Sequence, residues 1–283
     1  MDVCLVVRVH DRVADLRVCL DAVRRHWRRH RYHVVVASNG RAAGHPVPPG
    51  LAGGVQDIVE CDTATSHVAG AGALLRAAVP RVPLTCAYTV LLEADAWVHT
   101  DAVLDRYIQR MAATGAVWAS AVWVEKYGSL AVDVAVAQSA LLRDHPGLLD
   151  FSAHAERHVA AYLAAHRLPS LPLREHMPVH VPAVLRPFCP EPHGRFRSFP
   201  AGALVTHHLE DLPGGIVEKM QRANATLGRR EYDVVGPGDL TRAHRRLVWR
   251  QRIARLAPRS AWFRQRRSPE AARAGAPGGA SGR

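Results

Sequence analysis

The stretch TVLLEADAWVHTD (residues 89–101) decides how this sequence is interpreted. An apolar run through Leu92 is typical of a buried strand, and it leads directly to Glu93 and Asp95. Residues i and i+2 of an extended strand lie on the same face, so the two carboxylates are predicted to lie side by side. A divalent cation would offset their repulsion, and oxygen ligands suit Mg²⁺ or Mn²⁺. The stretch therefore predicts a metal site, with two solvated acids at a strand end as the alternative.

Outward from this stretch, apolar strand-like runs alternate with segments of helical periodicity. Strands are predicted at 3–9, 32–38, 54–62 and 87–95, and helices at 13–30, at 66–79 and from Thr100 or Asp101 to Ala113. Such alternation predicts an α/β fold with a parallel sheet and right-handed crossovers. Because ligands of such sheets bind at the carboxyl ends of the strands, the functional site is expected there.

The chain after residue 115 is less regular. A strand is predicted at 116–124, a helix at 152–166 and a short strand within 202–211, whereas 129–142 fits a strand or a helix equally. The proline-rich segment 169–200 is expected to be loop-rich, and 214–228 is predicted to be helical. We divide the chain into an N-terminal half (1–125), a second half of the same domain (126–238), a basic amphipathic helix (239–267) and a disordered tail (268–283).

Composition excludes several classes of protein. The 283 residues, 48% of them hydrophobic, suit a soluble globular protein, and no apolar run reaches the roughly 20 residues of a membrane span. The N-terminus lacks the basic segment and cleavage site of a secretory signal. Five widely spaced cysteines argue against a disulfide framework or a CxxC zinc site. They favour reduced thiols in a cytoplasm, so a cytoplasmic location is expected.

The positive charge is concentrated near the C-terminus. Residues 239–283 contain 12 Arg and two acids, a net charge of +10 out of the total of +12, which leaves +2 for the rest of the chain. The high isoelectric point therefore describes this segment and says little about the main domain.

The first 125 residues resemble the GT-A glycosyltransferases that use nucleotide-sugars. VCLVVRVHDR (3–12), LRVCLDAV (16–23) and YHVVVASNG (32–40) are similar to the opening of that family, in which a second strand ends near an Asn-Gly pair. SHVAGAGALLRAAVPRV (66–82) resembles the family's Gly-rich segment, and LLEADAWV (91–98) resembles its DXD motif. The resemblance implies a mixed, mainly parallel, Rossmann-like sheet flanked by helices, with a less regular acceptor region. It also implies a metal-dependent glycosyltransferase.

The resemblance implies roles for residues at the strand ends and in the Gly-rich segment. Glu93 and Asp95 would hold Mn²⁺ or Mg²⁺ against the diphosphate of the donor, and Glu93 would also contact the donor. Further donor contacts would come from His10, Asp11, Arg12, Asn39, Asp62, Gly70, Gly72 and Arg76. Each has a simpler alternative, such as a helix start for Asp11 or tight helix–sheet packing for the glycines.

Two further groups of residues are candidates in the second half. His207 or His208 follows an apolar strand and would supply a third metal ligand, with His207 preferred, as a C-terminal histidine does in many GT-A enzymes. An inverting enzyme would also need an acid that deprotonates the acceptor, and the candidates are Asp133, Asp150 and Glu156. An ordinary solvated helix residue is the alternative for Glu156.

The departures from the family pattern leave several interpretations open. The first acid is Glu93 instead of the commoner Asp, and residues 126–238 match no family pattern, so the acceptor and the stereochemical outcome stay open. The favoured donor is a UDP- or GDP-sugar and the acceptor a small molecule or a glycan. The alternatives are a catalytically silent nucleotide-binding protein of GT-A type and a sugar nucleotidyltransferase, although VRVHDR (7–12) lacks the GxGxR loop of the latter.

The arginine-rich segment 239–267 supports a third alternative, a basic module that binds RNA or a membrane surface. Its aromatic and aliphatic residues, Trp249 among them, allow it to dock on the domain or to contact an anionic membrane weakly at the inner face. Nucleic acid is less favoured because no reader motif accompanies the arginines. The high Ala, Arg, Val and Pro usage suggests a GC-rich bacterial source and a role in specialised metabolism or envelope polysaccharide.

Overall fold

A computed structural model describes residues 1–51, 53–61, 67–122, 129–152, 154–173, 195–198, 204–207 and the single residue 249. Seven strands form the main sheet in the order β3-β2-β1-β4-β7-β6-β8. Among these strands only β7 runs antiparallel to its neighbours. The strands are β1 (Asp2–Val9), β2 (Arg31–Ser38), β3 (Asp57–Glu60), β4 (Tyr88–Glu93), β6 (Trp118–Val122), β7 (Leu130–Gln138) and β8 (Ser170–Leu173). The predicted fold class, a mainly parallel sheet between helices, is confirmed.

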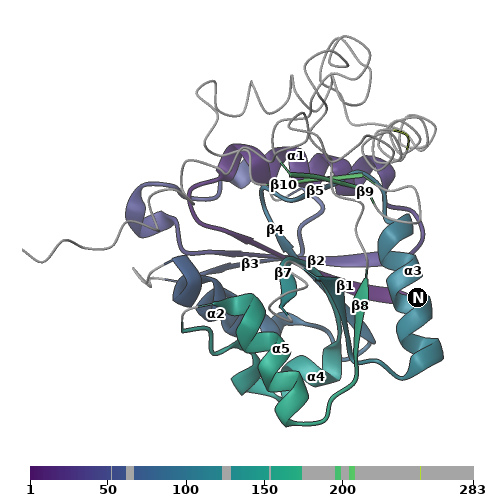
Figure 1. Cartoon of the computed structure of the whole chain (residues 1–283). Coiled ribbons are helices and arrows are strands. Elements are labelled where there is room, and N and C mark those ends of the chain that lie inside the picture. The colour runs from purple at the N-terminus through teal and green to yellow at the C-terminus, as the bar shows by residue number, and fades with distance from the viewer. Residues whose placement is uncertain are drawn as a thin grey trace, which may run out of the picture.

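Helices cover both faces of this sheet, as Figure 1 shows. The helices are α1 (Val13–His26), α2 (His67–Ala78), α3 (Ala102–Thr114), α4 (Ser139–Asp144) and α5 (Ala155–Ala165), with short 3-10 turns at Arg41–Ala43, Pro49–Leu51, Val79–Arg81 and Pro146–Leu149. Residues of α1 and α3 pack on one face of the sheet, and residues of α2, α4 and α5 pack on the other. Alternate residues of the central strands therefore enter two separate cores, which is why β1 and β4 are apolar along most of their length.

A small second sheet lies on the α1 side of the main sheet. It consists of β5 (Trp97–Val98), β10 (Leu204–His207) and β9 (Arg195–Ser198), with β10 in the centre and both neighbours antiparallel to it. Trp97 is fully buried in the core beneath α1. The strand predicted within 202–211 is thus confirmed for residues 204–207.

Helix α1 ends at His26, four residues before the predicted end. Trp27 has an extended backbone and donates its indole N–H to the carbonyl of Val98 at 3.0 Å. The buried carboxylate of Asp101 then accepts hydrogen bonds from the backbone N–H groups of Arg28 and Arg29, at 2.8 and 2.7 Å. These tertiary bonds replace the helical ones, so the helical periodicity of 13–30 overestimates the helix.

The segment 129–142, whose sequence fits a strand or a helix, contains one of each. It forms β7 and then α4, which begins at Ser139. Nearly all of β7 is buried, so its residues do not show the alternation that marks a strand with one solvated face. Among the described residues, no helix has the length and apolar character needed to span a membrane.

Candidate functional site

The carboxyl ends of four strands meet at one edge of the main sheet. Val9 of β1 pairs with Ser38 of β2, and Ser38 pairs with Glu60 of β3. On its other side β1 pairs with β4, where Arg8 lies opposite Glu93. The chain thus leaves β1 toward β2 on one side and reaches β4 on the other, so the edge between β1 and β4 is the topological switch point. Open α/β sheets bind their ligands in the crevice at such a point.

The acidic motif forms a turn at this switch point. Strand β4 ends at Glu93, and the N–H of Ala96 donates to the carbonyl of Glu93 at 3.0 Å, which closes a turn around Ala94 and Asp95. The N–H of Ala94 donates to the carbonyl of Arg8 at 3.0 Å and ties the turn to β1. The prediction of an extended strand through Asp95 is wrong, and the two carboxylates are not placed by strand alternation. Asp95 is buried and Glu93 is partly buried.

The buried guanidinium of Arg8 engages the carboxylate of Glu93. Its Nε donates to Oε1 of Glu93 at 3.1 Å, and its Nη2 donates to the same oxygen. Arg8 is only 5% exposed, so this is a largely desolvated ion pair. The sequence analysis did not identify Arg8, although a single charged residue within the apolar run VCLVVRV (3–9) is the signal that would have pointed to it.

Asp133, one of the candidate bases, belongs to the same part of the sheet. Val134 of β7 pairs with Leu92 of β4, and Asp133 is the neighbouring residue of β7. Asp133 is buried, with 4% of its surface exposed. The register between β6 and β7 shifts in the stretch of β7 from Leu130 to Ala135, which contains Asp133, so the strand pairing places Arg8 beside Glu93 but does not fix the direction of Asp133.

Histidine 207 lies close to the acidic turn in the backbone register. Thr206 of β10 pairs with Trp97 of β5, two residues after Asp95, and His207 is the last residue of β10. The structure does not describe the side chain of His207, and His208 and Asp62 lie outside the described residues. The backbone arrangement thus brings one predicted ligand position next to the acidic turn.

The chemistry of these side chains fits a divalent cation in one respect and opposes it in another. Carboxylate oxygens are the ligands that Mg²⁺ and Mn²⁺ prefer. The described residues include no group of three His, Cys, Asp or Glu side chains arranged to hold a metal ion. In addition, the Oε1 atom of Glu93 already accepts hydrogen bonds from Arg8. Glu93 can therefore contact a cation through that oxygen only if Arg8 releases it.

His10 and Asn39 meet beside the acidic turn, at the ends of β1 and β2. The Nδ1 atom of His10 lies 3.0 Å from Oδ1 of Asn39. Gly40 is needed for this contact, since a Cβ atom on it would lie 1.9 Å from the carbonyl oxygen of His10 and 2.7 Å from that of His45. The Ser-Asn-Gly sequence therefore lets the two loops approach closely, and His10 stays exposed at this edge of the sheet.

Asp11 and Arg12 occupy the start of α1. Asp11 is exposed, and Arg12 is the residue that precedes the helix, with its Nε 3.6 Å from Oδ2 of Asp15. No side-chain hydrogen bond caps the helix, so Asp11 is not the capping residue that the simpler interpretation expected. Both residues follow directly after β1 and lie at the same edge of the sheet as His10.

The Gly-rich helix α2 packs against the chain near Asp150. A Cβ atom on Gly72 would lie 2.4 Å from the carbonyl oxygen of Leu149, so Gly72 permits a close approach of the backbone. Arg76 donates from Nη1 to the carbonyl of Leu149 at 2.7 Å and to Oδ1 of Asp150 at 2.6 Å. The buried Gly70 lies on the same helix. Arg76 and Asp150, predicted for two separate roles, thus bind each other, and tight packing accounts for Gly72. Glu156 lies in the first turn of α5 and is partly buried.

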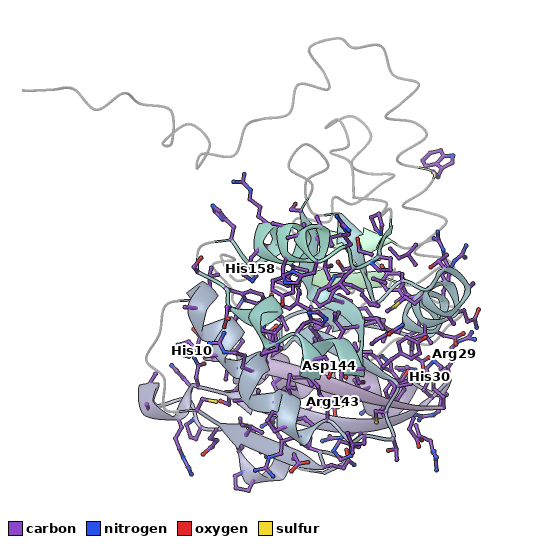
Figure 2. The ribbon with its side chains drawn as sticks, turned by 90° about the horizontal axis from the view of Figure 1, so that it is seen from below. His10, Arg29, His30, Arg143, Asp144 and His158 are labelled. Carbon is purple, nitrogen blue, oxygen red and sulfur yellow. The ribbon has the colours of Figure 1, made fainter. Side chains whose placement is uncertain are left out.

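A second group of charged residues lies at the opposite end of the molecule. Figure 2 shows His10 at one end and Arg29 and His30 at the other. Asp105 lies 3.3 Å from both Arg29 and His30, and burial lowers the pKa of His30 against the opposing effect of Asp105. Burial, followed by the nearby Asp101, raises the pKa of Tyr32 in the same region. These groups hold the loop between α1 and β2 and are far from the switch point.

Comparisons with known proteins found similarity only among solved structures. No family model matches the chain, and no curated protein sequence matches it. Similar structures include the mannosyltransferase PcManGT from Pyrobaculum calidifontis in complex with GDP-Man and Mn²⁺ (15% identity, TM-score 0.46) and mouse xyloside xylosyltransferase 1 in its apo form (14%, 0.44). S. aureus TarS (residues 1–349) in complex with UDP-GlcNAc is similar at 12% identity and a TM-score of 0.46.

These similarities cover part of each chain. The matches span 60%, 61% and 60% of this chain, and 54% of the mannosyltransferase, 85% of the xylosyltransferase and 56% of TarS. The chain thus matches little more than half the length of two of these proteins. Since the identities are 12–15% and the TM-scores lie below 0.5, the similarities assign no residue and no activity to this chain. The fold itself, read from its strands, is a mainly parallel seven-stranded sheet between helices, as the resemblance to GT-A glycosyltransferases implied.

Proposed function

We propose that this protein is a GT-A-type glycosyltransferase that moves a sugar from a nucleotide-sugar, with a UDP- or GDP-sugar favoured, to a small-molecule or glycan acceptor. The observation that carries the proposal is the position of Glu93 and Asp95 at the topological switch point, beside the His10–Asn39 contact. The similarity of residues 2–125 to the donor-binding half of that family supports it. A cytoplasmic location is in keeping with the described cysteines, all of which are free thiols.

The proposed roles follow the order of the strands along the edge. His10, Asp11, Arg12 and Asn39 contact the nucleoside and phosphate of the donor, and Asp95 with Glu93 binds a cation, with His207 as a third ligand position. When bound, Mn²⁺ or Mg²⁺ neutralises charge that develops on the departing nucleoside diphosphate. The bond between the anomeric carbon and the diphosphate oxygen breaks, and the acceptor oxygen forms the new bond to that carbon.

The acceptor loses a proton in this reaction, and an inverting enzyme takes it with a carboxylate. Among the three candidates, Asp133 is the one to test first because it is buried and adjoins Val134, which pairs with Leu92 next to Glu93. Asp150 already forms an ion pair with Arg76. Glu156 lies on the helix α5, which covers one face of the sheet, and not on one of the strands next to Glu93. Removal of the acid would lower kcat with little change in the binding of the donor.

The test is a calorimetric titration of the full chain with UDP, GDP, CMP and dTDP, each with and without Mn²⁺. The proposal expects one nucleotide to bind, and to bind tightly only when Mn²⁺ is present. Binding of none of the four, or binding that Mn²⁺ does not affect, would contradict it. The matching nucleotide-sugar then separates an enzyme from a silent binding protein, since only the enzyme releases the nucleoside diphosphate.

A further inference from the structure

Arg8 is a charged residue in a strand that is otherwise apolar. It lies at the penultimate position of β1, it is 5% exposed, and among the described residues its only side-chain partner is Glu93. The Nη1 atom of Arg8 is buried and has no hydrogen-bond partner among the described residues. A buried, incompletely satisfied guanidinium is costly to the fold, so its presence at the switch point suggests a use.

The charges around Arg8 are unequal. Arg8 and Glu93 lie on the face of the sheet that packs against α2, α4 and α5, because Val6 and Leu91, two residues earlier in each strand, enter that core. One guanidinium pairs there with one carboxylate across adjacent strands, and the buried Asp133 adjoins Val134, which pairs with Leu92. The acidic turn adds Asp95 two residues after Glu93. The site as a whole attracts cations, and Arg8 is the cation that the chain itself supplies.

We propose that Arg8 is an intrinsic counter-ion of the cation site: it holds Glu93 in the ligand-free protein and releases it when a diphosphate binds. This inference rests on the proposed function, since it concerns the cation and the diphosphate of the same site. A carboxylate oxygen that accepts two N–H donors has little capacity left for a metal ion. Arg8 therefore competes directly with a divalent cation for Glu93.

A diphosphate resolves this competition. Guanidinium groups bind phosphate oxygens with two parallel hydrogen bonds. Nη1 of Arg8 can donate the first without disturbing Glu93, and the second takes Nη2 away from Oε1 of Glu93. Once Arg8 turns to phosphate, Glu93 is available to a cation. Cation and diphosphate then strengthen each other's binding by the same factor, as linkage requires. Without a diphosphate, Arg8 keeps the affinity for the cation low.

The experiment titrates the full-length protein with Mn²⁺ alone and measures unbound Mn²⁺ by electron paramagnetic resonance. Arg8→Gln keeps an N–H donor for Glu93 and removes the positive charge, so we expect it to bind Mn²⁺ about tenfold more tightly than the natural chain. Arg24→Gln is the matched control, because it removes the same charge from a half-exposed arginine on α1 and is expected to leave the affinity unchanged. Equal or weaker Mn²⁺ binding by Arg8→Gln would overturn the inference.

A second variant keeps the inference testable if Arg8→Gln fails to fold. Glu93→Gln leaves the guanidinium in place and removes the carboxylate that it holds. We expect Mn²⁺ binding without added phosphate to change less than about twofold, since Glu93 is engaged by Arg8, and to fall about tenfold in the presence of pyrophosphate. An equal loss under both conditions would show that Glu93 binds the cation regardless of Arg8, and would overturn the inference.

The two proposals fail in different ways. Tighter Mn²⁺ binding by Arg8→Gln, with no nucleotide bound by any variant, would support the role of Arg8 and contradict glycosyl transfer. The opposite outcome is that the natural chain binds a nucleotide only with Mn²⁺, while Arg8→Gln binds Mn²⁺ no more tightly and Glu93→Gln loses Mn²⁺ affinity equally with and without pyrophosphate. That outcome would support glycosyl transfer and contradict the role of Arg8.

Discussion

Asp101 shows how a single buried carboxylate fixes a loop that is distant in the sequence. Its Oδ2 atom accepts hydrogen bonds from the N–H groups of Arg28 and Arg29 and from the hydroxyl of Tyr32, at 2.7–3.0 Å. Sequence analysis predicted that a helix starts at Thr100 or Asp101, but no side-chain hydrogen bond of Asp101 caps α3. The carboxylate instead binds two N–H groups just after α1 and the hydroxyl of Tyr32 in β2.

We predict that Asp101→Ala lowers the free energy of unfolding by about 3 kcal/mol, because it leaves three donors, two of them backbone groups, without their charged acceptor. Urea unfolding followed by circular dichroism measures this change. Asp21→Ala is the control: Asp21 pairs with Arg24 on the exposed face of α1, and its loss is expected to change stability by less than about 0.5 kcal/mol. A similar effect of both substitutions would contradict the assigned role.

The buried thiol of Cys4 predicts how stability depends on pH. Burial, with smaller effects from Cys86 and Asp57, raises the pKa of Cys4 from 9.0 to about 12. A group whose pKa is higher in the folded state contributes stability that is fully present below its unfolded pKa and is lost as pH rises toward the folded value. Stability is therefore expected to fall between pH 9 and 12, and the raised pKa of Tyr32 acts in the same direction.

Urea unfolding of the natural chain and of Cys4→Ala at about pH 8 and about pH 10.5 checks this expectation. The natural chain should lose more stability than the variant between the two conditions, since the variant has no thiol at this position. Parallel losses in the two proteins would contradict the assignment to Cys4.

At the scale of elements, the apolar runs correctly predicted β1, β2, β4 and α2, but their ends depended on tertiary contacts. Strand β4 ends two residues early because the Glu93–Ala96 turn is tied to β1. The structure of β7 could not be predicted because burial on both faces removes the alternation of polar and apolar residues. The periodicity of apolar residues indicates which face of a helix or strand is buried. It does not indicate where contacts with neighbouring elements end that helix or strand.

The contact between α2 and the turn at Pro146–Leu149 provides a prediction at this scale. We expect Gly72→Ala to lower the free energy of unfolding by about 1–3 kcal/mol, because its Cβ atom would overlap the carbonyl of Leu149 and force the helix away. Gly50→Ala is the matched control, since nothing lies within 4 Å of a Cβ atom there and its backbone needs no positive φ. Thermal unfolding of both variants tests the contact, and equal midpoints would contradict it.

At the scale of the whole molecule, the sequence predicted the class of fold. It did not predict the pair formed by Arg8 and Glu93, because that pair depends on which strands are neighbours. Arg8 and Glu93 are 85 residues apart and meet only because β4 pairs with β1 on the side opposite β2. Strand order is set by packing of the whole chain, and local patterns carry no information about it.

The strand order also changes the interpretation of the acidic motif. Glu93, which the sequence placed with Asp95 alone at a strand end, instead binds a buried arginine of the neighbouring strand. The proposed cation site thus contains charges of both signs. Glu93 is the carboxylate that pairs with Arg8, and Asp95 is the other carboxylate of the acidic motif. Asp95 is therefore expected to support Mn²⁺-dependent binding of a nucleotide at the switch point.

The most direct test is a calorimetric titration of the natural chain, Asp95→Asn and Asp21→Asn with the nucleoside diphosphate that binds best, in the presence of Mn²⁺. Asp21→Asn makes the same chemical change on the exposed face of α1. We predict that Asp95→Asn weakens Mn²⁺-dependent binding by at least about a hundredfold, about 3 kcal/mol, and that Asp21→Asn leaves it unchanged. Binding of equal strength in all three proteins would contradict a nucleotide and cation site at the acidic turn.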